Sequence, residues 1–584
     1  MLNLNLSRTF GLFLALLAIC FGLQAQAEYD GGRGMITPAQ TSTYVFLPDQ
    51  STVVKTGGIA GVHETYPIQG QFQLTVDASA SVASFDYVDA FLLSPISSSP
   101  PQRLGELLNM TELQGTVVND ALIEFRGKTA DNTNTDIALT LTFTDDAVQL
   151  TGQTIPPPNS ADFFIFELDA TALMKYGGGT GEPNHPYLIY TAEQMNAIGA
   201  APNDWAKHFK LMADIDLSVY TGKDFNIIGY WVDWGSSDNK PFAGVFDGNG
   251  HTISNFNCTS KGKNRIGLFG YVDGKNAHIK DLGLIDPNID ARRDVGSLVG
   301  WLREGTILNC YADGGSVVGN SNVGGLVGLQ DYGAITNCYA TASVSGDTSA
   351  GGLVGYNNWW CRISDCYSRG SVSGKEYVGG IVGLNRGTIA NCYVQGGSVL
   401  GSNTVVGFVG SNGWPHLPMG RPYPPADITN CYSTGSVSGS NHVGGLVGRQ
   451  GYGSVTASFW DIETSGLTTS DGGTGKTTAE MQVESTFTDA GWDFVDESTN
   501  GTEDIWSICE GTNYPRLVWQ IPAGDFVCPN GITIADLLFF IEHWGEENCD
   551  LGNNYCQGTD LDQSGTVDAR DLEILIENWP ADIE

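Results

Sequence analysis

Short segments of alternating apolar and polar residues dominate the first third of the chain. Examples are Gln71–Val76 and Ile137–Phe143, and they are separated by turn-forming clusters such as Pro156–Pro158. Such alternation is typical of half-buried antiparallel strands. We therefore expect a β-sandwich-like domain at residues 28–176.

The first residues follow a different pattern. Arg8 precedes an apolar run from Phe10 to Leu23, and the small-x-small sequence Ala25-Gln26-Ala27 follows it. This order predicts a signal peptide at residues 1–27 that is removed on export, with an uncleaved N-terminal anchor as the alternative. No later apolar run is long enough for a transmembrane span. We therefore expect an extracellular or bacterial cell-surface location.

A repeated pattern occupies the centre of the chain. Five copies recur between Asn309 and Gly448, from NCYADGGSVVGNSNVGGLVG to NCYSTGSVSGSNHVGGLVG. Their cysteines are spaced by 28, 28, 26 and 39 residues, at Cys310, Cys338, Cys366, Cys392 and Cys431. Self-similarity at a nearly fixed period predicts a repeat architecture.

Each copy contains three β-prone pieces, which are GGLVG, a segment ending in NCY, and a GSVSG-like segment. None can bury a face alone, so we expect turns stacked about 4.8 Å apart, with equivalent side chains in ladders. One predicted ladder is Leu326, Leu353, Ile381, Phe408 and Leu446. The cysteines form a second ladder of inert, buried thiols, and the adjacent tyrosines face the opposite way. Glycine is expected at the sharp turns.

These repeats resemble the GLUG family, named for its Gly-Leu-x-Gly pattern. The family occurs in bacterial cell-surface proteins, including adhesin-like chains, and the resemblance implies a right-handed parallel β-solenoid. We assign residues 177–520 to this solenoid and its end caps, since a solenoid must cover its open edges.

The chain is strongly acidic, with 65 Asp and Glu against 28 Lys and Arg and a net charge of −37. Such a field repels nucleic acid, so we expect no nucleic-acid partner. It favours divalent cations.

A twelve-residue segment near the C-terminus has the spacing of a calcium loop. Oxygen ligands at positions 1, 3, 5, 7, 9 and 12 suit Ca²⁺, and glycine at position 6 permits the turn. Here the sixth residue is Gly565, and the predicted ligands are Asp560, Asp562, Ser564, Thr566 (through its carbonyl), Asp568 and Asp571. The sequence therefore predicts a Ca²⁺ site.

The segment after this loop repeats an earlier one. Residues 571–579 and 536–544 share the pattern D-L-x-x-x-I-E-x-W at an offset of 35 residues. A weaker second site is expected at Asp525 and Asp536, because Val527 and Pro529 replace side-chain ligands there. The duplicated loop-helix arrangement resembles a type I dockerin at residues 524–584, a small α-helical module, and the resemblance implies a cohesin-like partner.

Aromatic residues interrupt the repeats at Trp359, Trp360, Trp414 and Tyr423. Exposed rings there could stack on sugars, so glycans are candidate ligands. No catalytic motif accompanies the repeats. Asp214 and Asp216 are a candidate carboxylate pair for glycan hydrolysis. The sequence favours a non-catalytic adhesin or scaffold with a calcium-binding tail. The alternative is a β-helix polysaccharide-degrading enzyme, a glycoside hydrolase or lyase, targeted by its dockerin.

Overall fold

The computed structural model describes the backbone of the strands between residues 40 and 174, and then residues 176–413, 424–495, 497, 499–528, 531–550 and 554–579. The chain forms two compact units, residues 1–194 with 207–212 and residues 195–206 with 213–584. The predicted signal peptide lies outside the described residues. Within the described part, none of the helices combines the length and the apolar run needed to cross a bilayer.

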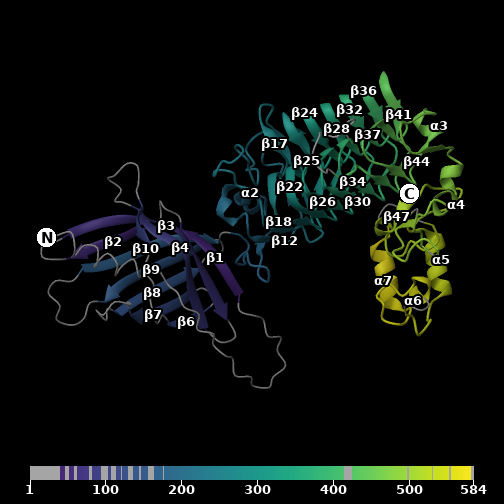
Figure 1. The fold of residues 1–584 in the computed structure, drawn as a ribbon. Helices are drawn as coiled ribbons and strands as arrows, with labels where there is room; N and C mark the ends of the chain where they lie inside the picture. Colours follow the sequence, from purple (N-terminus) through teal and green to yellow (C-terminus); the bar gives the residue numbers. More distant parts are fainter. Residues whose placement is uncertain are drawn as a thin grey trace. The chain divides into compact units, whose positions relative to one another are not determined.

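Ten antiparallel strands make up most of the first unit (Figure 1). They are β1 (Gln40–Phe46), β2 (Thr52–Gly57), β3 (Val62–Asp77), β4 (Val82–Leu93), β5 (Arg103–Glu106), β6 (Gln114–Asn119), β7 (Leu122–Lys128), β8 (Asp136–Phe143), β9 (Ala147–Ile155) and β10 (Phe164–Met174). The two alternating segments singled out above lie in β3 and β8.

The strand pairings correct one expectation for this unit. Pairings lead from β3 through β4, β6, β7, β8, β9, β10 and β1 back to β3. The described strands therefore form one closed sheet, and the two separate layers of the predicted β-sandwich are not observed among them. Alternation alone cannot distinguish these forms, since both bury one face of every strand.

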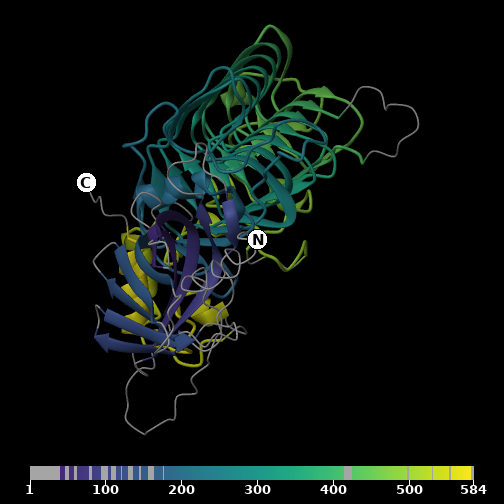
Figure 2. The same cartoon turned by 90° about the vertical axis from the view of Figure 1, so that its left-hand side faces the viewer.

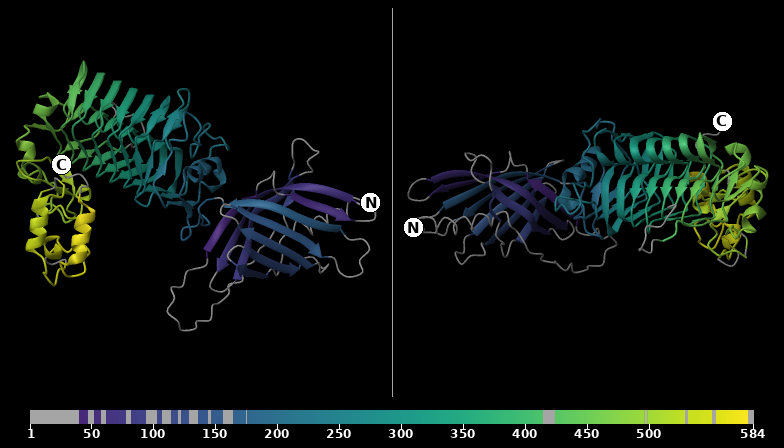
Figure 3. Two further views of the ribbon diagram at one scale, coloured as in Figure 1. Left: turned by 180° about the vertical axis from the view of Figure 1, so that it is seen from behind. Right: turned by 45° about the horizontal axis from the view of Figure 1, so that its top comes forward.

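The second unit is a stack of coils, and each coil adds short parallel strands to three β-sheet faces. This confirms the predicted parallel β-solenoid. Figure 3 shows its strands side by side along the stack, and Figure 2 shows the turns as nested loops. The first face contains β14 (Val245–Asp247), β18 (Phe269–Lys280), β22 (Val299–Leu308), β25 (Val327–Gln330), β26 (Gly333–Thr336), β29 (Val354–Asn357), β30 (Arg362–Ser364), β33 (Val382–Asn385), β34 (Thr388–Ala390), β37 (Val409–Asn412), β38 (Ile428–Thr429), β42 (Val447–Gln450) and β43 (Val455–Thr456).

The other two faces are built in the same way. The second contains β13 (Ile215–Asp216), β15 (Thr252–Ser254), β19 (Gly283–Ile285), β23 (Tyr311–Asp313), β27 (Tyr339–Ala340), β31 (Tyr367–Ser368), β35 (Tyr393–Val394), β39 (Tyr432–Ser433), β44 (Phe459–Asp461) and β45 (Thr474–Lys476). The third contains β16 (Asn257–Thr259), β17 (Asn264–Ile266), β20 (Asn288–Asp290), β21 (Arg293–Val295), β24 (Ser316–Gly324), β28 (Ser343–Gly351), β32 (Val372–Gly379), β36 (Ser398–Val406), β40 (Ser436–Ser438) and β41 (Asn441–Gly444).

The predicted apolar ladder fills the centre of the stack. Successive members are joined by backbone hydrogen bonds, such as Leu353 N–H to the Ile381 carbonyl at 3.0 Å. All five members, Leu326, Leu353, Ile381, Phe408 and Leu446, are fully buried. The five repeat cysteines are also buried and unpaired by disulfides. Burial raises the pKa of the Cys310, Cys366 and Cys431 thiols well above the usual value, which is consistent with inert thiols at these three positions.

Asparagine and aspartate occupy sharp corners of the stack, as do the expected glycines, such as Gly314 and Gly396. The residue before each repeat cysteine has a left-handed backbone, with φ of 52° at Asn309 and Asn337 and 54° at Asn430. Asparagine enters this region more readily than most residues with a Cβ. Its amide also bonds to the turn beside it, as in Asn337 Nδ2 to Asn309 Oδ1 at 3.2 Å.

A second amide ladder lies inside the stack. Asn357 donates to Asn385 at 2.7 Å, and Asn385 donates to Asn412 at 2.7 Å. Asn412 donates to Gln450 at 3.1 Å. An amide both donates and accepts, so successive amides of the column satisfy one another away from water, and only the Asn357 Oδ1 at its start is without a partner.

The repeat tyrosines form a flat stack on the outside of the second face. Ring centroids of Tyr311, Tyr339, Tyr367, Tyr393 and Tyr432 are 4.7–5.0 Å apart, with interplanar angles of 1–8°. The cap segment after β45 packs against this stack through an aromatic and aliphatic cluster that includes Phe487, Trp492, Trp506 and Leu517. The cap therefore covers the flank of the solenoid in addition to its end.

Hydrogen bonds anchor the cap to the stack. Tyr393 donates its hydroxyl to Gln520 at 2.9 Å, and Tyr432 donates to the Pro515 carbonyl at 2.6 Å. The short elements here are α3 (Ile462–Ser465), α4 (Ser485–Thr488), β46 (Trp506–Ser507) and β47 (Arg516–Leu517), and α2 (Ala192–Ala200), β11 (Tyr187–Ile189) and β12 (His208–Leu211) precede the solenoid.

The C-terminal segment contains α5 (Ile534–Glu542), α6 (Asn554–Gln557) and α7 (Ala569–Glu577). Its own small core includes Ile532, Phe540, Val567 and Leu575. The Cys549–Cys556 disulfide lies in this core, and Cys509–Cys528 links the segment to the cap. The sequence left these pairings open.

The apolar ladder predicts a large cost for truncating one member. Phe408→Ala should lower the free energy of unfolding by about 3–5 kcal/mol, because it leaves a cavity in a close-packed column. Leu400→Ala is the control, since Leu400 is 48% exposed in the same turn, and it should change stability by less than about 0.5 kcal/mol. Guanidinium unfolding, followed by the near-ultraviolet circular dichroism of the tyrosine stack, measures both. Equal effects would contradict the ladder.

Candidate functional site

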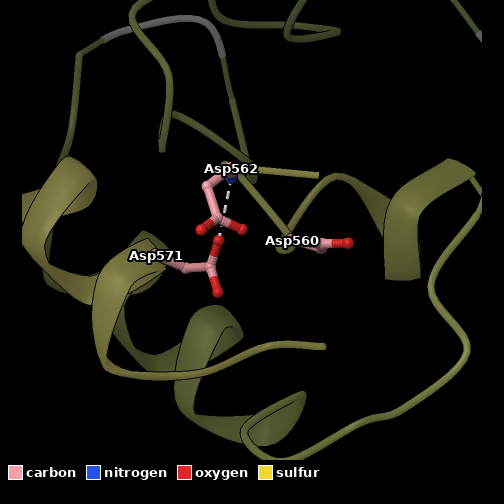
Figure 4. Close-up of side chains that lie close together, drawn as sticks. All are labelled: Asp560, Asp562 and Asp571. Atoms are coloured by element: carbon pink, nitrogen blue, oxygen red, sulfur yellow. Dashed lines mark hydrogen bonds between the residues drawn. The ribbon is translucent and has the colours of Figure 1, made fainter. Parts of the chain in front are cut away.

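The loop from Asp560 to Asp571 brings three carboxylates together. The ligand oxygens of Asp560, Asp562 and Asp571 all lie within 4.8 Å of one another (Figure 4). Gly565 makes the sharp turn with a φ of 96°. A Cβ there would meet only the Cys549 carbonyl, at 3.8 Å, so the backbone angle and not crowding favours glycine.

Backbone N–H groups hold Asp560 in place. Its two oxygens accept from Ser564 at 3.0 Å and from Gly565 at 2.9 Å. The residue is only 2% exposed. Its orientation is thus fixed by the loop itself.

Asp571 is held by the start of a helix. Its oxygens accept the N–H groups of Asp562 at 3.0 Å and Asp568 at 2.8 Å. Asp568 is the N-cap of α7 and accepts the Arg570 N–H at 2.8 Å. Asp571 is fully buried in the first turn of α7, a place where the helix dipole favours negative charge.

This donor set fits Ca²⁺. All of its ligand atoms are oxygens, as a hard cation prefers. Each oxygen of Asp560 and Asp571 accepts one backbone hydrogen bond and retains a second lone pair. Hydrogen bonds from Ser564 lower the pKa of Asp562, so this carboxylate is ionised at neutral pH. A bound cation would supply the charge that offsets the repulsion among the three.

The remaining predicted ligands are placed less directly. Ser564 donates its hydroxyl to the Thr566 carbonyl at 3.3 Å, so these two lie side by side. Asp568 does not belong to the three-carboxylate cluster and instead caps α7. Position 9 of such loops often reaches the ion through water.

The loop from Asp525 to Asp536 has a different pattern of hydrogen bonds. Asp536 accepts four hydrogen bonds, from the N–H groups of Phe526, Val527 and Thr533 and from the Thr533 hydroxyl, at 2.7–2.8 Å. Asp525 accepts from Gly531 at 2.8 Å. Protein donors thus hold Asp536 in place, and no carboxylate cluster is found around it among the described residues.

Trp359 and Trp360 lie at a corner of the solenoid, between β29 and β30. Trp360 is 60% exposed, and Trp359 is partly buried beneath the guanidinium of Arg386, 4.9 Å from its ring centroid. Trp414 and Tyr423 lie outside the described residues.

Sequence reasoning missed Tyr332, the counterpart of Trp360 in the preceding turn. In the preceding turn Tyr332 has the equivalent place, two residues before Ala334, which pairs with Arg362. It is also 60% exposed. Aligning the corners of the repeats, instead of their strands, would have revealed this pair.

Asp331 joins these turns at the corner. It accepts a hydrogen bond from Trp301 Nε1 at 2.8 Å and another from Asn358 Nδ2. Burial raises the pKa of Asp331. We name the surface formed by Trp231, Trp234, Trp301, Asp331, Tyr332, Tyr356, Asn358, Trp359, Trp360 and Arg386 the aromatic corner.

The candidate catalytic pair, Asp214 and Asp216, has a local structural role. Asp214 accepts the Thr252 N–H at 2.8 Å, and this bond lowers its pKa. Asp216 accepts from Asn255 Nδ2 at 2.8 Å and from Ser218, and its pKa is lowered too. Both are therefore ionised at neutral pH and unsuited to act as a general acid.

The second loop predicts one calcium site. Asp560→Ala with Asp571→Ala should abolish Ca²⁺ binding in isothermal titration calorimetry, because both buried ligands are lost. Glu573→Ala, which removes an exposed acid of α7, should leave binding intact. Chelation should destabilise residues 524–584 and leave the tyrosine-stack signal unchanged. Binding that survives the double substitution would refute the site.

The first loop predicts a contrasting result. Asp536→Ala should cost about 1–3 kcal/mol, since it leaves buried donors without a partner. The loss should be the same in calcium and in chelator, and titration should still give one Ca²⁺ per chain. A stoichiometry of two in the unsubstituted protein would show that this loop also binds metal.

Comparison with known proteins identifies the repeats. Residues 319–345, 346–373 and 374–400 match the GLUG motif. The chain is 29% identical over 286 residues to Halomucin of Haloquadratum walsbyi, covering 48% of this chain and 3% of that protein. It is 36% identical over 109 residues to a protein of Evansella cellulosilytica named as a Gly-rich membrane protein, covering 19% and 12% of the two chains. The chain thus spans a small part of both relatives, and residues 319–400 are GLUG repeats.

Proposed function

We propose that this protein is a secreted or cell-surface, non-catalytic adhesin or scaffold component. Its solenoid is the support, and its C-terminal segment attaches it to a partner protein through a calcium-closed, dockerin-like module. The names of the two relatives, Halomucin and a Gly-rich membrane protein, support a surface location.

An exposed apolar stripe on α5 carries this proposal. Ile534, Leu538, Ile541 and Trp544 are 70%, 57%, 55% and 50% exposed. Their spacing of four, three and three residues puts the first three on one side of α5 and Trp544 just beyond the end of the helix at Glu542. A contiguous exposed apolar stripe on a helix marks a protein-binding face.

The duplication within the module is broken at these positions. At the offset of 35 residues, α7 has Ala569 where α5 has Ile534, and Glu573 where α5 has Leu538. Ile576, the counterpart of Ile541, is also exposed, at 60%. Only α5 therefore presents a continuous apolar stripe, and we assign the partner contact to it.

The calcium loop supports the same attachment. Leu575 of α7 is fully buried in the core shared with Phe540 of α5. A cation that fixes the start of α7 thereby stabilises the packing that holds α5. The partner we propose is a cohesin-like module.

Glycan degradation is the less supported alternative. The only carboxylate pair considered for it, Asp214 and Asp216, accepts local hydrogen bonds and has lowered pKa values. Retaining and inverting glycosidases both need a carboxyl group that is protonated when the reaction starts.

Substitutions on α5 test the attachment. Leu538→Asp with Ile541→Asp should abolish capture of the full chain by purified type I cohesin modules in calcium, because charges cannot enter an apolar contact without a large desolvation cost. Ile576→Asp is the matched control on α7 and should still be captured. Surface plasmon resonance measures both. Failure of every cohesin to bind the unsubstituted chain would reject this partner, and equal loss with Ile576→Asp would reject α5 as the contact.

A further inference from the structure

The aromatic corner has a layered construction. Tyr271, Trp301 and Leu329 occupy equivalent positions in β18, β22 and β25 and are buried. The exposed ring of Trp234 packs on Trp301 with centroids 5.7 Å apart and remains 71% exposed. A buried apolar layer thus supports exposed rings above it.

The exposed rings stand on a fixed backbone. Tyr332 and Trp360 have φ of 52° and 66°, a region that bulky side chains rarely adopt. Both lie in successive turns, so their backbones are about 4.8 Å apart along the stack. The same left-handed backbone recurs at other corners of the stack, such as Asn309 and Asn337, so the solenoid itself holds these two residues in place.

Hydrogen-bonding groups lie in the same turns as the exposed rings. Tyr356 donates its hydroxyl to Asn358 at 2.9 Å, and Arg386 donates to the same hydroxyl. Asn358 in turn contacts Asp331. The aromatic corner therefore combines exposed rings with polar groups, and an apolar peptide helix would leave these polar groups buried without water.

The charged residues in and next to the aromatic corner are paired. Arg265 lies 3.9 Å from the Trp231 ring centroid and pairs with Asp294 at 3.7 Å. Arg303 pairs with Asp273 at 2.5 Å. The third arginine, Arg386, interacts electrostatically with Asp331.

Each of these three arginines thus has an aspartate beside it, and Asp294 also pairs with Arg293 at 3.4 Å, so neither a polyanion nor a polycation meets an unpaired cluster of opposite charge. The chain as a whole has a net charge of −37, which disfavours a polyanion further. A ligand of this corner is expected to be neutral.

We propose that the aromatic corner binds a neutral polysaccharide laid along the solenoid axis across Trp234, Tyr332 and Trp360. A pyranose has an apolar C–H face that stacks on an aromatic ring and hydroxyls that bond to groups such as Asn358 and Arg386. The rise of one solenoid turn is close to the length of one sugar unit, so consecutive sugars meet consecutive turns. The proposal names a ligand for the scaffold proposed above and rests on that function.

Titration of the full chain with cellohexaose, mannohexaose and maltohexaose tests the proposal, and hexagalacturonate is the acidic comparator. At least one neutral hexasaccharide should bind. Tyr332→Gly with Trp360→Gly should weaken it at least tenfold. Glycine suits the left-handed backbone at both positions, so the fold should be retained, as circular dichroism will show.

Leu400→Ala is the control, because it removes an apolar side chain that is 48% exposed on the third face of the solenoid, and it should leave glycan affinity unchanged. Conversely, the glycine variant should still be captured by a cohesin that captures the unsubstituted chain. Binding of none of the neutral sugars, preferential binding of hexagalacturonate, or unchanged affinity in the glycine variant would each overturn the proposal. Loss of cohesin capture alone would reject the attachment and leave the glycan site standing.

Discussion

In-register hydrogen bonding between successive turns is the constraint on which the solenoid depends. It puts every side chain next to its counterpart from the turns above and below, about 4.8 Å away. Only residues that pack or hydrogen-bond favourably with copies of themselves can occupy such a column. Leucine and phenylalanine pack, tyrosine rings stack flat, and the amides of Asn357 and Asn385 both donate and accept. A column of like charges would repel itself, which explains why the interior ladders are neutral.

The same constraint made much of the fold predictable. The period of the repeat identified the ladder through Phe408 and the buried cysteines, because stacking converts sequence periodicity directly into contacts. The cover on the tyrosine stack was not foreseen, since Trp492 and Trp506 come from a non-repetitive segment far along the chain. The closed N-terminal sheet was missed for a related reason: alternation predicts strands but not the order in which they pair.

Some features of the candidate sites were likewise predictable from the sequence, and others were not. The three-carboxylate cluster was predictable because its members belong to one short segment, and Asp560, Asp562 and Asp571 do lie together. The hydrogen bonds that hold Asp536 depend on backbone positions that a ligand pattern does not encode. The aromatic corner combines residues from several turns and from a loop before them. Trp360 was identified because it interrupts a repeat, whereas Tyr332 and Trp234 required the stacking geometry.

The Cys509–Cys528 disulfide has a mechanical consequence. If the C-terminal segment is attached to one body and the solenoid to another, tension between them passes along the covalent chain. The crosslink shortens that path, so the intervening 18 residues are spared and the pull enters the cap at Cys509. From there it acts on the aromatic cluster packed across several tyrosines. The load is then shared by many turns in shear instead of peeling the last turn from the end of the stack.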